Sequence, residues 1–322
     1  MSKKALCIGI NYKGTQNALL GCINDVYNVQ NYLKKQGYSN FTIITDDTAV
    51  KPTKNNIFDA LNNFVNSLSS GDTGVIWYSG HGTRVKDRNG DEISGFDSCI
   101  CPIDFQTAGF IVDDDINNIL KKVVYGANLN VVFDSCNSGT ACDLKYNYYD
   151  SSKCKKRVLP KAFVPNDWTI RQSYLENKRV SNLNGNISLI SGCGDNQTSS
   201  DTIVGGKPSG ALTGYLLQVL EAYPNLSWGD LLSYLNCTLT IYGYSQKPQL
   251  SLSRNISIKS ANIFQNKTTS NLSTKTKSRE IFATGFDLSK LKNKGDNIKN
   301  KSHKHRKNSS FLGDIVNFIG FI

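Results

Sequence analysis

Short apolar segments alternate with amphipathic segments up to about residue 258, and this alternation limits the possible fold more than any other feature. Apolar runs of strand length separated by helix-length segments are typical of parallel strands joined by crossover helices. The predicted strands are Ala5–Ile10, Phe41–Thr45, Gly74–Tyr78, Leu129–Phe133, Ile187–Ile190 and Gln249–Ser253. The predicted helices are Asn24–Lys35, Thr53–Leu68, Asp114–Lys122, Leu212–Leu220 and Trp228–Leu239. We therefore expect an α/β fold, a three-layer sandwich with helices on both faces of a mainly parallel sheet.

Two of the predicted strands are followed by residues suited to nucleophilic catalysis. Gly74–Tyr78 leads to His81, the only histidine before residue 303, and Leu129–Phe133 leads to Cys136. The carboxyl ends of parallel strands meet at one edge of a sheet, where ligands bind in open α/β folds. A thiol beside an imidazole can attack a carbonyl carbon, because the imidazole removes the thiol proton. The alternative is an inert buried cysteine after an ordinary strand that ends near glycine.

Three motifs together resemble the metacaspases, cysteine peptidases of the clan that includes caspases and legumain. They are Tyr78-Ser-Gly-His81-Gly82, Asp134-Ser-Cys136-Asn-Ser-Gly139 and Gly21-Cys22-Ile-Asn-Asp25, and the resemblance extends from about Lys3 to about Ser253. The resemblance implies a caspase-like fold in which Cys136 is the nucleophile and His81 its base. It also implies that the N–H groups of Gly82 and Cys136 bind the oxyanion. Metacaspases usually have histidine where this chain has Asn137, so we expect tuned rather than abolished activity.

The same resemblance implies a pocket for a cationic side chain. It would be lined by Asp25 and Asp134, with Cys22 and Ser79 nearby. Asp134 lies two residues before Cys136 and so points to the same side of an extended chain. Because desolvated carboxylates pair strongly with Arg and Lys, we expect protein or peptide substrates to be cleaved after these residues. The alternative role of Asp134 is to cap the turn that follows it.

Four further aspartates match, through the resemblance, the ligands of calcium-dependent metacaspases. They are Asp97, Asp113, Asp114 and Asp143. Carboxylates, completed by carbonyl oxygens or water, are the hard donors that calcium prefers, so calcium is the expected cofactor. The run Asp113–Asp115 could instead cap the next helix and interact with its dipole. Both roles are compatible if Asp115 is the cap and the other two are ligands.

By composition the chain of 322 residues divides into a peptidase domain at 1–258 and a basic tail at 259–322. We expect the domain to contain a large region at about 1–144, an exposed connection at about 145–185 and a small region at about 186–258. The connection is rich in Lys and Arg, which makes self-cleavage there plausible. The tail holds 13 Lys and Arg against 4 Asp and Glu, and so carries +9 of the net charge of +11. Because the body is nearly neutral, we do not expect specific nucleic-acid binding.

The end of the tail is apolar at 311–322 and follows a basic cluster at 301–307. Such a pair can lie on an anionic membrane surface, although docking on the body or disorder is favoured because short unpacked helices are marginal. The nine cysteines and the absence of a secretory signal before the first strand favour a reduced, cytoplasmic monomer. A caspase-like protein that binds partners with little or no catalysis is the alternative function. The presence of both His81 and Cys136 argues against it.

Overall fold

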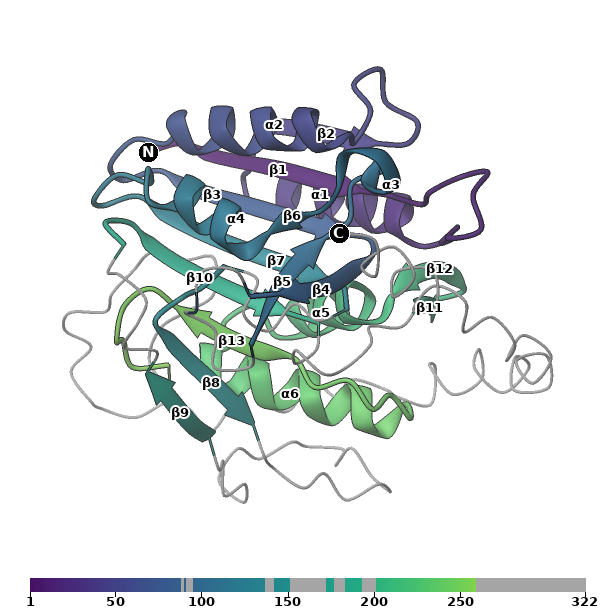
Figure 1. The fold of residues 1–322 in the computed structure, drawn as a ribbon. Helices are drawn as coiled ribbons and strands as arrows, with labels where there is room; N and C mark the ends of the chain where they lie inside the picture. The colour runs from purple at the N-terminus through teal and green to yellow at the C-terminus, as the bar shows by residue number, and fades with distance from the viewer. Residues whose placement is uncertain are drawn as a thin grey trace, which may run out of the picture.

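The computed structural model describes residues 1–87, 90, 95–136, 142–150, 172–176, 183–192 and 201–258. In this part of the chain the main sheet has the strand order β2-β1-β3-β7-β10-β13-β8-β9 (Figure 1). Its strands are β1 (Lys3–Gly9), β2 (Asn40–Thr45), β3 (Thr73–Ser79), β7 (Asn128–Asp134), β8 (Tyr146–Asp150), β9 (Gln172–Glu176), β10 (Asn186–Ser191) and β13 (Gln249–Leu252). Strands β2, β1, β3, β7 and β10 are parallel, whereas β13, β8 and β9 are antiparallel to their neighbours. The predicted mainly parallel sheet is confirmed.

Helices cover both faces of this sheet. One face packs against α1 (Cys22–Lys35), α5 (Ala211–Ala222) and α6 (Trp228–Ile241), and the other against α2 (Lys54–Asn66) and α4 (Asp113–Leu120). Successive strand residues point to opposite faces, so Ile76 joins the core under α2 while Trp77 joins the core under α1. The centres of β1 and β3 are continuous apolar runs, Ala5–Ile8 and Val75–Tyr78, because both of their faces are buried. This arrangement confirms the predicted three-layer α/β sandwich.

Several short elements were not predicted. A second sheet joins β4 (Gly82–Lys86), β5 (Phe96–Ile100) and β6 (Ile111–Val112), with α3 (Phe105–Ala108) between its last two strands, and a hairpin joins β11 (Asp201–Val204) to β12 (Lys207–Gly210). Their sequences mix polar and apolar residues without a clear period, so their strand character depends on pairing with neighbours. In Figure 1 the second sheet lies beside the end of β3 and β7.

The start of the connection at about 145–185 differs from the expected exposed segment. Strand β8 pairs antiparallel with β13, and Tyr148 within it is buried. The pattern of alternating aromatic and polar residues in β8 becomes a sheet strand because a partner about a hundred residues away completes it. Apart from Lys145, the Lys and Arg residues of the connection lie outside the described residues, as do Asn137 and the whole tail. The division into large and small regions stays a prediction.

The described cysteines are not all reduced. Six are free thiols, but Cys237 is disulfide-bonded, which corrects the expectation of a fully reduced chain. Within the described ranges, no helix is long and apolar enough to cross a membrane.

Candidate active site

Strand register brings His81 and Cys136 to one place. The parallel pairing of β3 with β7 sets Ser79 opposite Asp134. His81 lies two residues after the end of β3, and Cys136 lies two residues after the end of β7. Gly82 then packs on the backbone of Cys136 so closely that a Cβ atom there would collide with the carbonyl oxygen of Cys136. A glycine is therefore required where the two strand ends touch. The contact holds the proposed base and nucleophile at the same carboxyl edge of the sheet.

The imidazole of His81 has a defined orientation. Its Nε2 lies 2.7 Å from the main-chain carbonyl oxygen of Asn17. Since a carbonyl can only accept a hydrogen bond, Nε2 carries the proton, and Nδ1 is the basic nitrogen of the neutral ring. Burial lowers the pKa of His81, and the bond to Asn17 opposes this shift only in part. The ring is thus neutral near pH 7 and able to accept a proton.

Cys136 differs from the other free cysteines of the described chain. It is half-buried, whereas the other five are buried: Cys7, Cys22, Cys99, Cys101 and Cys142. Burial raises the pKa of the Cys101 thiol, and the nearby Cys136 raises it further, so Cys101 stays protonated. A buried protonated thiol is a poor nucleophile. Cys136 is therefore the described free thiol best placed to react with a substrate.

Two carboxylates lie together beside these strand ends. Asp25 and Asp134 are 0% and 4% exposed, and a Cβ atom added to Gly210 would touch the carboxylates of both. Asp25 accepts hydrogen bonds from Ser79 Oγ at 2.6 Å, Ser209 Oγ at 2.5 Å and the Gly210 N–H at 2.9 Å. Burial, and then the charge of Asp134, raise the pKa of Asp25 to about 7 despite these bonds. At neutral pH the pair therefore holds a proton for part of the time.

Asp134 also caps a helix that is distant from it in the sequence. Its Oδ2 accepts a hydrogen bond from the Thr213 N–H at 2.8 Å, in the first turn of α5. Cys22 is buried at the first position of α1, one turn before Asp25 and on the same side of the helix. The structure thus brings together all four residues expected at the pocket: Cys22, Asp25, Ser79 and Asp134.

The second acidic group surrounds two buried thiols in and near the small sheet. Asp97, Asp113 and Asp143 are buried, and Asp114 is partly exposed. Burial raises the pKa of the Cys99 thiol, and the charges of Asp113 and Asp97 raise it further. Burial also raises the pKa of the Cys142 thiol, and the charges of Asp143 and Asp113 add to that shift. These carboxylates are therefore neighbours, and their oxygen donors suit calcium chemically. In the described part of the chain, however, no three or more such side chains are already arranged to hold a metal ion.

The N-cap of α4 is Val112 and not the expected Asp115. Helix α4 begins at Asp113, so Asp115 lies inside the first turn and is not its cap. Asp113 accepts hydrogen bonds from the N–H groups of Ser98 at 2.6 Å and Asp114 at 3.0 Å. It thereby joins α4 to β5 and places a negative charge at the positive end of the helix.

Sequence reasoning missed Asn17, Ser209, Gly210 and Thr213 as contributors to the site. Asn17 acts through its carbonyl group, which leaves no mark in the sequence. The run Pro208-Ser209-Gly210 before an apolar helix was a usable sign of a strand end followed by a helix start. Nothing local, however, connects Ser209 with Asp25, which precedes it by 184 residues.

The chain is similar to known proteins of one family. Residues 3–145 match a family model described as metacaspase, peptidase C14 domain. Metacaspase-1 of Yarrowia lipolytica is 40% identical over 285 residues, covering 78% of this chain and 61% of the relative, whose length the chain therefore spans only in part. Metacaspase-1 of Scheffersomyces stipitis is 38% identical over 285 residues, covering 78% of this chain and 70% of the relative.

The fold is also found in a solved structure. The crystal structure of a Geobacter sulfurreducens protein aligns with a TM-score of 0.57 and 24% identity, covering 82% of this chain and 98% of that one. At this identity the likeness supports the fold alone. The fold, the placement of the three motifs and the two Metacaspase-1 relatives together show that the chain belongs to the metacaspase family.

Proposed function

We propose that the chain is a cysteine endopeptidase in which Cys136 is the nucleophile and His81 the general base. The observation that carries this proposal is the register of β3 and β7, which sets the two residues at one sheet edge in backbone contact through Gly82. The hydrogen bond from His81 Nε2 to the Asn17 carbonyl supports the proposal further, because in the neutral ring it makes Nδ1 the nitrogen that accepts a proton.

The proposed reaction follows from these positions. His81 Nδ1 takes the Cys136 thiol proton, and the thiolate attacks the peptide carbonyl carbon. The N–H groups of Gly82 and Cys136 stabilise the negative charge that develops on the carbonyl oxygen. The protonated imidazole then gives its proton to the leaving amine. Water, deprotonated by His81, finally hydrolyses the thioester and frees the enzyme.

The proposed specificity is for Arg or Lys before the scissile bond. It is supported by two adjacent buried carboxylates at the edge that carries Cys136. A guanidinium or ammonium group that enters beside them would favour the ionised form of Asp25, since an opposite charge lowers the pKa of a carboxyl. Substrates ending in Asp would add a third negative charge and be rejected.

Calcium is proposed as an activator held by Asp97, Asp113, Asp114 and Asp143. The support is chemical, because buried carboxylates that lie near one another repel until a cation neutralises them. A bound calcium ion would supply positive charge to offset the repulsion among these residues, and they in turn would hold the small sheet beside His81. Activation in this proposal also permits self-cleavage within the connection at about 145–185.

Turnover of a fluorogenic peptide with Arg before the leaving group, with and without calcium, tests the proposal. We expect calcium-dependent cleavage that Cys136→Ala abolishes and His81→Ala nearly abolishes. Bands that appear with calcium and vanish in Cys136→Ala would show self-cleavage. Turnover by Cys136→Ala would contradict the assigned nucleophile. Peptide binding without turnover by the unaltered chain would instead favour the alternative of a binding protein.

A further inference from the structure

A single loop contacts His81 at three points. The Asn17 carbonyl accepts from Nε2, the ring of Tyr12 lies 4.7 Å from the imidazole between centroids, and the hydroxyl oxygen of Tyr12 lies 3.0 Å from the His81 N–H, which donates to it. Both Tyr12 and Asn17 belong to the segment between β1 and α1, the loop of residues 11–20. The orientation of the proposed base therefore depends on the shape of this loop.

Tyr12 has an unfavourable backbone conformation. Its φ of 49° lies in the left-handed region, which is uncommon for a bulky side chain. Its surroundings must hold that conformation, and Thr15 contributes locally, because its N–H and hydroxyl donate to the Tyr12 carbonyl at 3.2 Å and 2.8 Å. Inside the protein the Tyr12 hydroxyl donates to the Cys101 carbonyl at 2.6 Å, and this bond anchors only the far end of the side chain.

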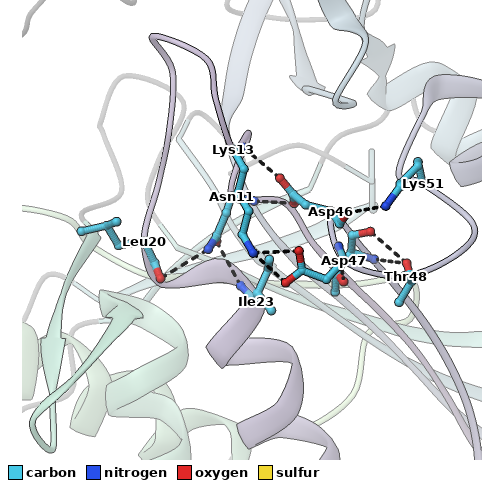
Figure 2. A network of polar contacts seen from close by, with 9 residues as sticks. Asn11, Lys13, Leu20, Ile23, Asp46, Asp47, Thr48 and Lys51 are labelled. Carbon is cyan, nitrogen blue, oxygen red and sulfur yellow. Dashed lines mark hydrogen bonds and ion pairs between the residues drawn. The ribbon is translucent and has the colours of Figure 1, made fainter.

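The backbone on both sides of Tyr12 is held by one carboxylate. Asp46, directly after β2, accepts from the Asn11 N–H at 2.8 Å through Oδ1 and from the Lys13 N–H at 3.0 Å through Oδ2 (Figure 2). These two N–H groups flank Tyr12 in the chain. A buried carboxylate with both oxygens engaged in this way fixes the torsions of the residue between its donors.

Asn11 closes the other end of the loop. Its Oδ1 accepts from the Ile23 N–H at 3.1 Å, and its Nδ2 donates to the Leu20 carbonyl at 3.4 Å (Figure 2). Its own carbonyl accepts from the Leu19 N–H at 2.8 Å. The two legs of the loop are thus joined at the residue that Asp46 holds. Asn17 lies within the closed loop, so the position of its carbonyl follows from the same contacts.

We propose that Asp46 is a positioning residue for His81, acting through the left-handed conformation of Tyr12 and the carbonyl of Asn17. Asp46 touches neither the imidazole nor a substrate. It sets the tautomer and direction of the base by fixing the loop that contacts it. This inference rests on the proposed function to the extent that it treats His81 as the base.

The neighbouring Asp47 offers a matched control. Its carboxylate binds the side-chain Nζ of Lys13 at 2.7 Å, but its side chain is 52% exposed. We expect Asp46→Asn, which keeps one acceptor oxygen, to lower kcat about tenfold, and Asp46→Ala to lower it about a hundredfold. KM should change less than about twofold in both, because the pocket acids are untouched. Asp47→Asn and Asp47→Ala should leave kcat within about twofold.

Nitrogen-15 NMR of histidine-labelled protein tests the same inference without turnover. His81 is one of three histidines, so His81→Gln assigns its signals. We expect a protonated Nε2 in the unaltered chain and in Asp47→Asn, and a mixture of tautomers in Asp46→Asn, a variant that thermal unfolding should show to be folded. An unchanged tautomer together with an unchanged kcat in Asp46→Asn would overturn the inference, as would equal losses in the Asp47 variants. Activity that survives His81→Ala would instead refute the proposed function, while the NMR result would still report on the loop.

Discussion

The two acidic groups of this protein bury their carboxylates in different ways. Asp25, beside the main sheet, accepts hydrogen bonds from β3 and β12, elements that are distant from it in sequence. Asp113, beside the small sheet, accepts from the backbone of the adjacent β5 and of its own helix. The first group is preassembled by these hydrogen-bond donors, and burial with the charge of Asp134 raises the pKa of Asp25, whereas the second group is proposed to await a cation. Buried like charges can thus be stabilised in two ways: by hydrogen-bond donors with a raised carboxyl pKa in the first group, and, in the proposal for the second group, by a cation.

The largest expected effect comes from removing a charge from the first group. Asp25→Ala or Asp134→Ala should raise the barrier for Arg peptides by about 2–5 kcal/mol, a loss in kcat/KM on the order of 30- to 5000-fold. Asp134→Asn keeps an acceptor for the Thr213 N–H and so separates the loss of charge from the loss of the α5 cap. Steady-state kinetics on Arg peptides provide the measurement. If Asp134→Asn cleaved Arg peptides at the normal rate, the Asp134 carboxylate would have no role in substrate specificity.

The second group should respond to calcium rather than to the substrate. Replacing both Asp113 and Asp114 by Ala should abolish activation by calcium, because two of the proposed ligands are gone. The bond from the Ser98 N–H is also lost, which we expect to cost about 0.5–2 kcal/mol of stability. Activity should be titrated with calcium and with a chelator, alongside thermal unfolding. Full activity of the unaltered chain in excess chelator would refute the calcium proposal.

The pH dependence of substrate binding should distinguish the two groups. The pKa of Asp25 is raised to about 7, so its carboxyl gains a proton as the pH falls through 7 and loses its attraction for Arg. KM for Arg peptides should therefore rise below pH 7, by up to about tenfold per pH unit. Asp25→Asn should have a higher KM that varies little over this range. A flat KM between pH 5 and 8 in the unaltered chain would contradict the role of Asp25.

The smallest effect should come from a single hydroxyl of the first group. Ser209 donates to Asp25, and this bond lowers the pKa of the carboxyl, so Ser209→Ala should move the KM transition to higher pH. We expect KM at pH 7 to rise a few-fold and stability to fall by about 0.5–1.5 kcal/mol. Ser188→Ala is the control, because that buried hydroxyl bonds to Asn130 in the middle of the sheet. Equal changes in KM for both variants would point to a general loss of stability.

Local sequence patterns determined six strands of the main sheet (β1, β2, β3, β7, β10 and β13), its covering helices and the positions of His81 and Cys136 at strand ends. Each of these depends on periodicity or on a strand that ends before glycine, which neighbouring residues specify. The small sheet and β8 could not be predicted in the same way, since their mixed sequences form strands only when paired with a partner.

Tertiary structure alone decided which groups contact the proposed catalytic residues and the acids beside them. The register of β3 and β7 set His81 level with Cys136, and the approach of β12 to α1 supplied Ser209 and Gly210 to Asp25. Asp46 likewise accepts hydrogen bonds from the N–H groups on both sides of Tyr12, and these bonds join the ends of β1 and β2. These contacts depend on which distant segments pack side by side, and periodicity within one segment carries no information about its partner. The sequence by itself therefore determined the chemistry available, and the fold decided how that chemistry is held.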